Sequence, residues 1–176
     1  MKKLLLFLTI ATTVTSVNAQ KSKTDKPLLF SLGLEGALPV GDFGDTHSFG
    51  IGGSLQGEYK ADTDLGITLN AGYITYSGKE VTFPQPIGTI KMESFGLIPI
   101  LAGVKYYFGG GAYAHGQLGI GMGTDEGQGS NFMYSPGIGY MFAPGLDAEL
   151  KYTGLSSSGE NTGSANSVGL RLAYNF

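Results

Sequence analysis

The chain has 176 residues and a formal net charge of −3, so it is long enough for one domain and little more. Fourteen acidic side chains outnumber eleven basic ones, which excludes the basic surface typical of nucleic-acid-binding proteins. No cysteine is present, so disulfide bonds do not hold the fold. Thirty glycines, with ten tyrosines and ten phenylalanines, favour a β-protein with many close backbone contacts.

Residues 1–19 have the layout of a secretory signal peptide. Two lysines at positions 2 and 3 precede an apolar stretch over 4–11, and an A-x-A-like end predicts cleavage between Ala19 and Gln20. The alternative is a membrane anchor, but the apolar stretch is much shorter than the roughly 20 residues of a spanning helix. Processing leaves nine basic and fourteen acidic side chains, a net charge of −5.

From Leu28 onward, apolar residues recur at every second position, the period of a strand with two different faces. Eight segments share this alternation. The first four apolar faces are Phe30, Leu32, Leu34, Leu38; Phe49, Ile51, Leu55, Tyr59; Leu65, Ile67, Leu69, Ala71, Tyr73; and Ile98, Ile100, Ala102, Val104, Tyr106, Phe108. The next four are Ala114, Leu118, Ile120, Met122; Phe132, Tyr134, Ile138, Tyr140, Phe142; Leu146, Ala148, Leu150, Tyr152; and Val168, Leu170, Leu172, Tyr174, Phe176.

The connections between these segments alternate in length. Those at 60–64, 109–111 and 143–145 are short and rich in turn residues, whereas 39–48, 77–93, 124–131 and 155–166 are longer and polar. Short turns on one side and long loops on the other are typical of outer-membrane barrels, whose short turns are periplasmic. Pro99 and Pro136 fall inside predicted strands, where the missing N–H predicts a bulge.

Alternation alone also fits a soluble, lipocalin-like barrel with an apolar interior. Three features favour the membrane barrel. The residues that alternate with the apolar ones, which we call the second parity, include charged side chains among glycines. Aromatic residues gather at both strand ends, and the chain ends on Phe176 within an alternating strand. We therefore predict an all-β fold, a transmembrane antiparallel up-and-down β-barrel of about eight strands.

Three segments carry a family resemblance. Leu170–Phe176 resembles the C-terminal assembly signal of outer-membrane barrels, with Tyr174 and Phe176 as its aromatic residues, and Gly103–Phe108 and Gly137–Tyr140 resemble strands of the small OmpA/OmpX-like barrels, the "outer membrane protein beta-barrel domain" family. The resemblance implies insertion by the outer-membrane assembly machinery and contact with membrane lipid and lipopolysaccharide. It also implies a Gram-negative outer-membrane location with both termini in the periplasm, so that residues 20–27 form a short periplasmic segment and 28–176 the barrel.

The charged residues of the second parity form the strongest candidate site. They are Glu35, Glu58, Lys105, His115, Asp147, Glu149, Lys151 and Arg171. Because the interior of an eight-stranded barrel is just wide enough for side chains, these charges must be paired. Glu35 and Arg171 are expected to form a salt bridge with Glu149 and Lys151 nearby. Structural packing is the preferred interpretation, and a gated ion path is the alternative.

No catalytic, cofactor-binding or metal site is predicted. His47 lies beside Asp45 and Ser48, but neighbours in sequence do not by themselves form a nucleophile–base geometry. Outer-membrane lipid deacylases have a His-x-Ser motif, but His115 is followed by Gly116 and Gln117, so the serine is absent. The acidic residues of the loops could share a divalent cation, but the preferred interpretation is that they are solvent-exposed and bind no ion.

The favoured function is a non-enzymatic, monomeric barrel that acts through its external loops in envelope structure or surface interaction. The longest loop, 77–93, keeps strand character, and a turn at 84–86 predicts a protruding hairpin with Val81, Phe83, Ile90 and Met92 on its outer face. Its unpaired edges could add a strand from a surface protein, or the four residues could cover lipopolysaccharide or other loops. The runner-up is a narrow channel or binding site for small hydrophobic molecules, with an apolar mouth formed by Ile74, Tyr76, Leu97 and Leu101. A lipid-modifying enzyme is the third class and lacks a recognisable site.

Overall fold

The computed structural model describes residues 28–83, 88–124, 129–142, 145–156 and 164–176. Its elements in chain order are β1 (Leu28–Val40), α2 (Asp42–Thr46), β2 (His47–Lys60), β3 (Leu65–Gly78), β4 (Glu80–Phe83), β5 (Gly88–Lys91), β6 (Phe95–Gly109), β7 (Ala112–Gly123), β8 (Ser130–Phe142), β9 (Leu146–Ser156) and β10 (Ala165–Asn175). No helix in this part of the chain is long and apolar enough to cross a membrane. The predicted cleavage site at Ala19 and Gln20, the segment 20–27 and the turn at 84–86 lie outside the described residues.

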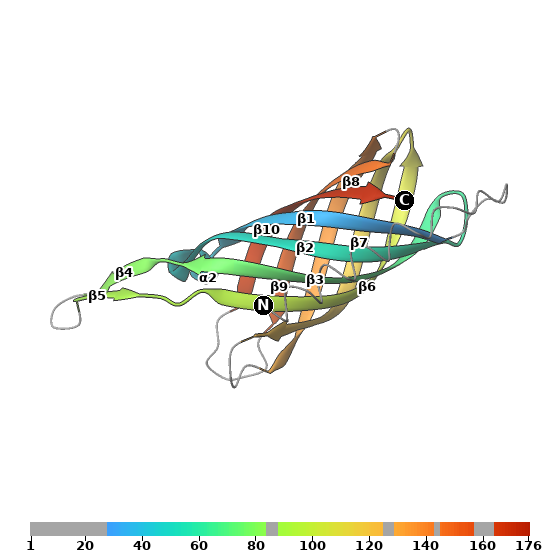
Figure 1. Cartoon of the computed structure of the whole chain (residues 1–176). Helices are drawn as coiled ribbons and strands as arrows, with labels where there is room; N and C mark the ends of the chain where they lie inside the picture. The colour runs from blue at the N-terminus through green and yellow to red at the C-terminus, as the bar shows by residue number, and fades with distance from the viewer. Residues whose placement is uncertain (1–27, 84–87, 125–128, 143–144, 157–163) are drawn as a thin grey trace, which may run out of the picture.

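Eight of the strands close into an antiparallel barrel in the order β1-β10-β9-β8-β7-β6-β3-β2 (Figure 1). Each barrel strand pairs with the next one along the chain, and β1 closes the barrel against β10. The predicted up-and-down barrel of eight strands is therefore confirmed. Because the sheet closes on itself, the barrel exposes no open strand edge.

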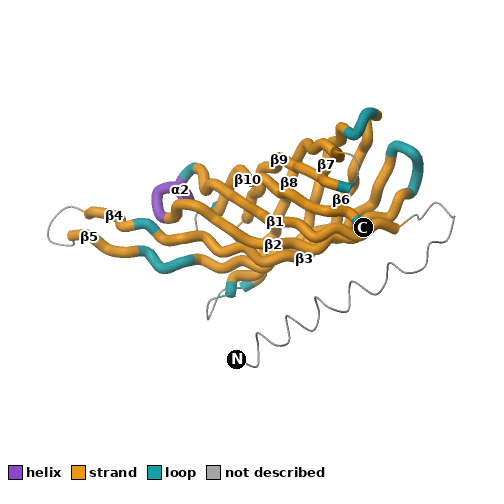
Figure 2. The backbone as a smooth tube through the Cα atoms, turned by 45° about the horizontal axis from the view of Figure 1, so that its top comes forward, coloured by secondary structure: helices purple, strands orange, loops and turns teal. Residues whose placement is uncertain are grey.

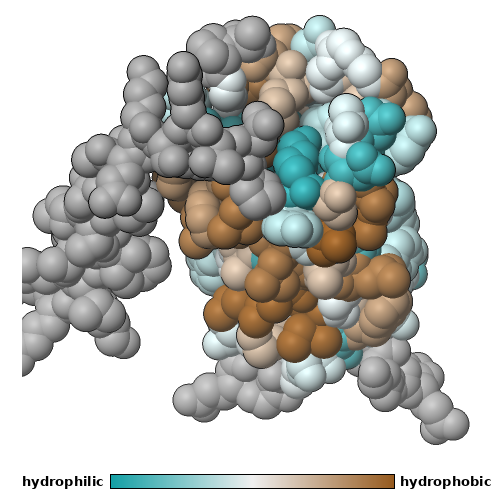
Figure 3. All heavy atoms as spheres, turned by 90° about the vertical axis from the view of Figure 1, so that its right-hand side faces the viewer, coloured by the Kyte–Doolittle hydropathy of each residue, from teal (hydrophilic) through white to brown (hydrophobic). Residues whose placement is uncertain are grey.

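The apolar parity of every barrel strand faces outward. Leu34 is 73% exposed and Ile138 is 63% exposed, whereas the charged residues Lys105 and Asp147 of the other parity are 0% exposed. Hydrophobic side chains form a broad brown area over the visible wall in Figure 3. A soluble protein rarely exposes an apolar surface of this extent, whereas a membrane barrel requires it.

The short and long connections lie at opposite ends of the barrel. Gly109, Gly110 and Gly111 at the β6–β7 turn have φ values of 89°, 63° and 93°, which a side chain would disfavour. Figure 2 shows α2 and the β4–β5 pair at one end and the C-terminus at the other. We call these the loop end and the turn end.

The bulges predicted at Pro99 and Pro136 are wrong. Both prolines keep register with β7, opposite Gly121 and Gly116 respectively, without a shift. On their other side the register also continues, but the pairs at the prolines are missing from the β3–β6 and β8–β9 ladders. The missing N–H therefore interrupts a ladder without inserting a residue. Register shifts occur instead between His47 and Gly50 and next to the β6–β7 turn.

Candidate functional site

The lumen near the turn end is organised around Lys105 on β6. Its ammonium nitrogen lies 3.1 Å from Asp147 Oδ2 and 3.5 Å from Glu58 Oε2. The Tyr113 hydroxyl donates to Asp147 Oδ1 at 2.5 Å, and the Tyr107 hydroxyl donates to Glu58 Oε1 at 2.6 Å. On the outer side of Glu58, Lys60 Nζ lies 3.0 Å from Oε1. Two cations and two phenols therefore satisfy two buried carboxylates that come from β2 and β9.

His115 on β7 forms the next layer of the lumen. Its Nδ1 lies 2.9 Å from Glu149 Oε1, and its Nε2 lies 2.9 Å from Thr68 Oγ1. The two contacts hold the ring between β3 and β9 and leave neither ring nitrogen unpartnered. Because a carboxylate only accepts hydrogen bonds, the Nδ1–H donates to Glu149.

Glu35 on β1 is the centre of a third layer. Lys151 Nζ lies 2.9 Å from Glu35 Oε2, and Ser54 Oγ donates to Glu35 Oε1 at 2.6 Å. Arg171 Nε lies 3.6 Å from Glu35 Oε1 but donates to Ser54 Oγ at 2.9 Å, while its Nη2 donates to Ser31 Oγ at 2.9 Å. Glu35 and Arg171 are thus adjacent cross-strand neighbours, yet the shorter ion pair of Glu35 is with Lys151.

All eight charged residues that the sequence singles out lie in this network. The network also has neutral members that the charge pattern did not single out, which are Ser31, Ser54, Thr68, Tyr107 and Tyr113. Their inward parity was the signal that could have identified them. Among the described residues, two buried side-chain nitrogens lack a hydrogen-bond partner, Gln117 Nε2 and Arg171 Nη1.

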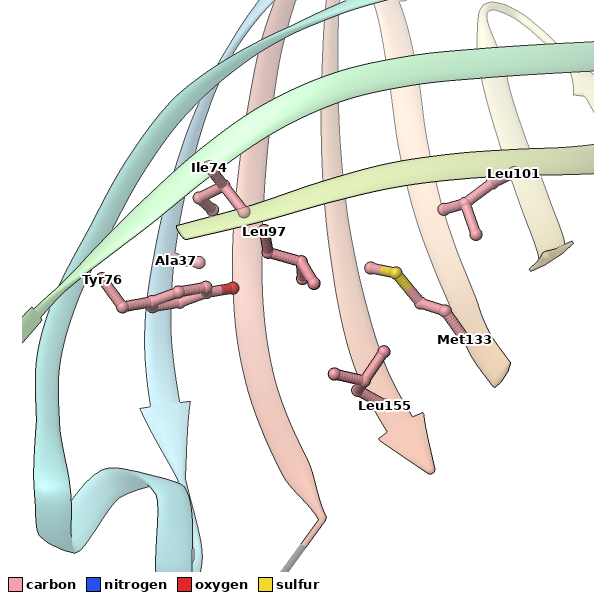
Figure 4. Close-up of a cluster of buried hydrophobic side chains, with 7 residues drawn as sticks. All are labelled: Ala37, Ile74, Tyr76, Leu97, Leu101, Met133 and Leu155. Carbon is pink, nitrogen blue, oxygen red and sulfur yellow. The ribbon is translucent and has the colours of Figure 1, made fainter. Parts of the chain in front are cut away.

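The lumen near the loop end is apolar. Figure 4 shows the cluster of buried side chains that fills it, which we call the mouth cluster: Ala37, Ile74, Tyr76, Leu97, Leu101, Met133 and Leu155. The cluster includes all four residues of the predicted apolar mouth. A cavity of about 30 Å³ lies between this cluster and the Glu35–Lys151 pair, enough for about one water molecule.

Helix α2 covers the mouth cluster. The Phe43 ring makes edge contacts with Tyr76 and Phe95, with centroids 5.0 Å and 5.7 Å apart. Lys79 Nζ donates to Gly44 O at 2.6 Å, which ties the helix to the segment after β3. The barrel is therefore closed by ion pairs in one half and by apolar packing in the other.

His47 and Ser48 do not form a nucleophile–base pair in the structure. His47 Nδ1 lies 2.9 Å from Thr46 Oγ1, and the ring packs on Phe43 at 4.6 Å between centroids. Ser48 Oγ donates to Ser77 O instead of approaching the imidazole. Within the described ranges, no three His, Asp or Glu side chains are grouped to hold a metal ion.

A second candidate site is the β4–β5 hairpin, which extends beyond the loop end (Figure 1). The two strands form a separate sheet with Val81 opposite Ile90 and Thr82 opposite Thr89. Val81 and Ile90 therefore share one face, and Ile90 is 44% exposed. Phe83 lies opposite Gly88, and the backbone N–H of Met92 donates to Lys79 O at 2.9 Å, which continues the pairing towards the barrel.

The two residues of the predicted assembly signal lie at the turn end. Tyr174 faces outward and is 58% exposed, and it pairs with Leu32 of β1 and Leu146 of β9. The backbone N–H of Phe176 donates to Phe30 O at 2.9 Å. The C-terminal residue thus contributes to the closure of the barrel against β1.

Comparison with solved structures shows that the fold is shared with small membrane barrels. Ail of Yersinia pestis, solved in complex with the heparin analogue sucrose octasulfate, is 16% identical with a TM-score of 0.56, and the match covers 85% of this chain and 97% of Ail. The N-terminal β-barrel domain of Pseudomonas aeruginosa OprF is 18% identical with a TM-score of 0.52, over 84% of this chain and 97% of that domain. A de novo designed transmembrane β-barrel is 13% identical with a TM-score of 0.52, over 88% of this chain and 100% of the design.

A comparison with curated proteins finds no match. The sequence profile of the family described as "Outer membrane protein beta-barrel domain" matches residues 7–176, nearly the whole chain. Together with the closed eight-stranded barrel and its apolar outer wall, this match gives the location as the Gram-negative outer membrane. The chain belongs to the outer membrane protein beta-barrel domain family.

Proposed function

We propose that this protein is a non-enzymatic, monomeric barrel that acts through its external segments, in envelope structure or surface interaction. The observation that carries the proposal is the β4–β5 hairpin, which stands beyond the barrel and forms a sheet of its own. The packing of the lumen supports it, because the buried ion pairs and the mouth cluster leave little free volume for transport.

The closed lumen has a direct electrical test. Protein refolded into a planar lipid bilayer is expected to show no steady single-channel conductance, because Lys105, Glu58 and Asp147 occupy the cross-section near the turn end. Stable openings in the unmodified protein would favour a gated ion path and contradict a structural lumen.

The hairpin is the element that we propose meets a partner protein. Val81 and Ile90 offer an apolar pair, and a two-stranded sheet has outer edges that can accept an extended segment. We expect Phe83→Ser combined with Ile90→Ser to reduce adhesion to host or neighbouring-cell proteins without unfolding the barrel. Thr82→Ala with Thr89→Ala is the matched control, because these residues form the opposite face. Unchanged adhesion of the first variant, with an intact barrel, would assign these side chains to lipopolysaccharide or loop packing.

A second function is favoured by the mouth cluster, whose seven buried side chains form an apolar site beneath α2. A small hydrophobic molecule could bind there if the Phe43 ring moved off Tyr76. Titration with an environment-sensitive hydrophobic dye tests this function. Phe43→Ala is expected to increase dye binding, and equal binding by both proteins would remove this candidate.

We propose the following biogenesis. Residues 1–19 are removed, the mature chain starts at Gln20, and the outer-membrane assembly machinery recognises Tyr174 and Phe176. Residues 20–27 and both termini then lie in the periplasm, and the barrel wall contacts membrane lipid and lipopolysaccharide. Deleting Phe176 is expected to reduce the amount of inserted barrel, measured by membrane fractionation, and N-terminal sequencing of the inserted protein should give Gln20. Finding Met1 in the inserted form would contradict signal cleavage.

A further inference from the structure

Helix α2 is held over the mouth cluster by contacts with other parts of the chain. It has five residues, contains Gly44 in its interior and begins after Gly41 without a side-chain cap. None of its residues is buried. Isolated helices shorter than about 12–15 residues are marginal in water, and an interior glycine weakens them further. The position of α2 over the loop end therefore depends on its neighbours.

The first set of contacts is aromatic. The Phe43 ring packs on the rings of His47, Tyr76 and Phe95, with centroids 4.6 Å, 5.0 Å and 5.7 Å apart. Tyr76 belongs to the mouth cluster, whereas His47 and Phe95 are the first residues of β2 and β6. Phe43 therefore shields Tyr76 from the loop end.

The second contact comes from Lys79, which follows β3. Its Nζ donates to Gly44 O at 2.6 Å. The last carbonyls of a helix have no partner within the helix, and an ammonium group beside them also interacts favourably with the helix dipole. The backbone N–H of Lys79 donates to Thr46 O at 2.8 Å, so the end of α2 stays attached when the side-chain contact is broken.

Gly41 provides a hinge at the start of α2. Its φ of 62° and ψ of −149° are a combination that is essentially restricted to glycine. A Cβ atom built at Gly41 meets nothing within 4 Å, so the backbone conformation, and not crowding, disfavours a side chain there. The helix thus has a glycine hinge before it, an attached end at Thr46 and the Lys79 contact between them.

We propose that α2 is a lid that controls access to the mouth cluster, with the Lys79 side chain as its latch. This inference rests on the proposed binding of a small hydrophobic molecule by that cluster, and adds its regulation. In the closed state Phe43 covers Tyr76. In the open state the contact between Lys79 and Gly44 is broken, rotation at Gly41 moves Phe43 away, and an uncharged apolar ligand reaches the cluster from the loop end. The apparent affinity for the ligand then scales with the fraction of protein whose lid is open.

The motion of the lid can be tested with an introduced fluorophore in the full barrel in lipid nanodiscs. The chain contains no tryptophan, so Phe43→Trp places a single indole on the lid. Adding Lys79→Met or Gly41→Ala is expected to shift the indole emission to longer wavelength and to increase its quenching by acrylamide. If Phe43→Trp does not fold, deuterium exchange of the Gly44 amide, which donates to Gly41 O at 2.8 Å, measures the same motion in chains that keep Phe43.

Each lid variant has a matched control. Lys91→Met is the control for the latch, because Lys91 lies on the hairpin opposite Glu80. Gly116→Ala is the control for the hinge, because Gly116 is an exposed residue of β7 whose added Cβ also meets nothing within 4 Å. Neither control is expected to change the emission, and heat-dependent mobility on SDS gels checks that every variant is folded.

Dye binding separates the lid from the site beneath it. In chains that keep Phe43, Lys79→Met is expected to tighten binding of the environment-sensitive dye about 5-fold, because loss of the latch raises the open fraction. Unchanged emission and unchanged Gly44 exchange in both lid variants would overturn the lid, even if Phe43→Ala binds more dye. An equal response to Lys91→Met would also overturn it. Increased indole exposure in Lys79→Met, with no gain of dye binding in Phe43→Ala, would instead contradict the proposed binding function and leave the latch in place.

Discussion

The two halves of the lumen are closed by different physical means. Near the turn end, Lys105 is placed between Asp147 and Glu58, and each charge depends on the position of the others. Near the loop end, Leu101, Met133 and their neighbours exclude water by shape and contact with no requirement for specific partners. A buried charge that loses its partner carries the full cost of desolvation, whereas a shortened apolar side chain costs only its contacts and the cavity it leaves. Mutational sensitivity should therefore be concentrated in few residues at the turn end and be spread over many at the loop end.

The largest effect is expected for Lys105→Met. It leaves the carboxylates of Asp147 and Glu58 facing each other without their shared cation, and should lower the free energy of unfolding by about 3–5 kcal/mol. Urea unfolding in lipid vesicles measures the change. Lys60→Met is the control, because Lys60 also pairs with Glu58 but is 28% exposed, and it should cost less than about 1 kcal/mol. A similar loss in the free energy of unfolding for both variants would contradict the idea that burial makes the Lys105 ion pairs more important.

A smaller loss is expected for Leu101→Ala in the mouth cluster. Leu101 is 2% exposed, so its removal leaves a cavity and should cost about 2–4 kcal/mol in the same unfolding assay. Leu118→Ala on the outer wall is the control and should cost less, because lipid can fill the space. If Leu101→Ala costs less than its control, the mouth cluster does not support the barrel.

The boundary between the two halves can be examined with Glu35 and Arg171. The double-mutant cycle of Glu35→Gln and Arg171→Met should give a coupling energy of about 0.5–3 kcal/mol, because the residues also share Ser54 as a hydrogen-bond partner. The coupling of Glu35 with Lys151 should be larger, since that ion pair is shorter, 2.9 Å against 3.6 Å. Additive single mutants in both cycles would show that these residues do not interact.

The smallest effect concerns backbone dynamics. The ladder pairs at Pro99 and Pro136 are missing on one side, so the β3–β6 ladder should open more readily beside Pro99. The amide of Gly72 should then exchange with deuterium faster than those of Thr68 and Asn70, which point in the same direction and lie in the continuous part of the same ladder. Hydrogen exchange followed by NMR in nanodiscs measures the difference. Uniform protection along β3 would mean that the interrupted ladder has no dynamic consequence.

The barrel architecture follows from patterns that are visible in the sequence. Alternation in segments such as Leu32–Glu35 fixes which side chains share a face, and charges on the second parity favour a polar interior, because a strand has a period of two residues wherever it lies. The alternation of short and long connections predicted the two ends. Local rules also identified the hairpin, since Val81 and Ile90 continue the parities of the strands that flank them.

The partner of each buried charge, in contrast, depends on the closed barrel. Asp147 and Lys105 are far apart in sequence, and they meet because barrel closure sets the register of strands that are not neighbours. The same closure gives Lys151 the shorter contact with Glu35, although Arg171 is the direct cross-strand neighbour. Periodicity specifies the face of a side chain, but contacts across a barrel depend on the register of every strand between them.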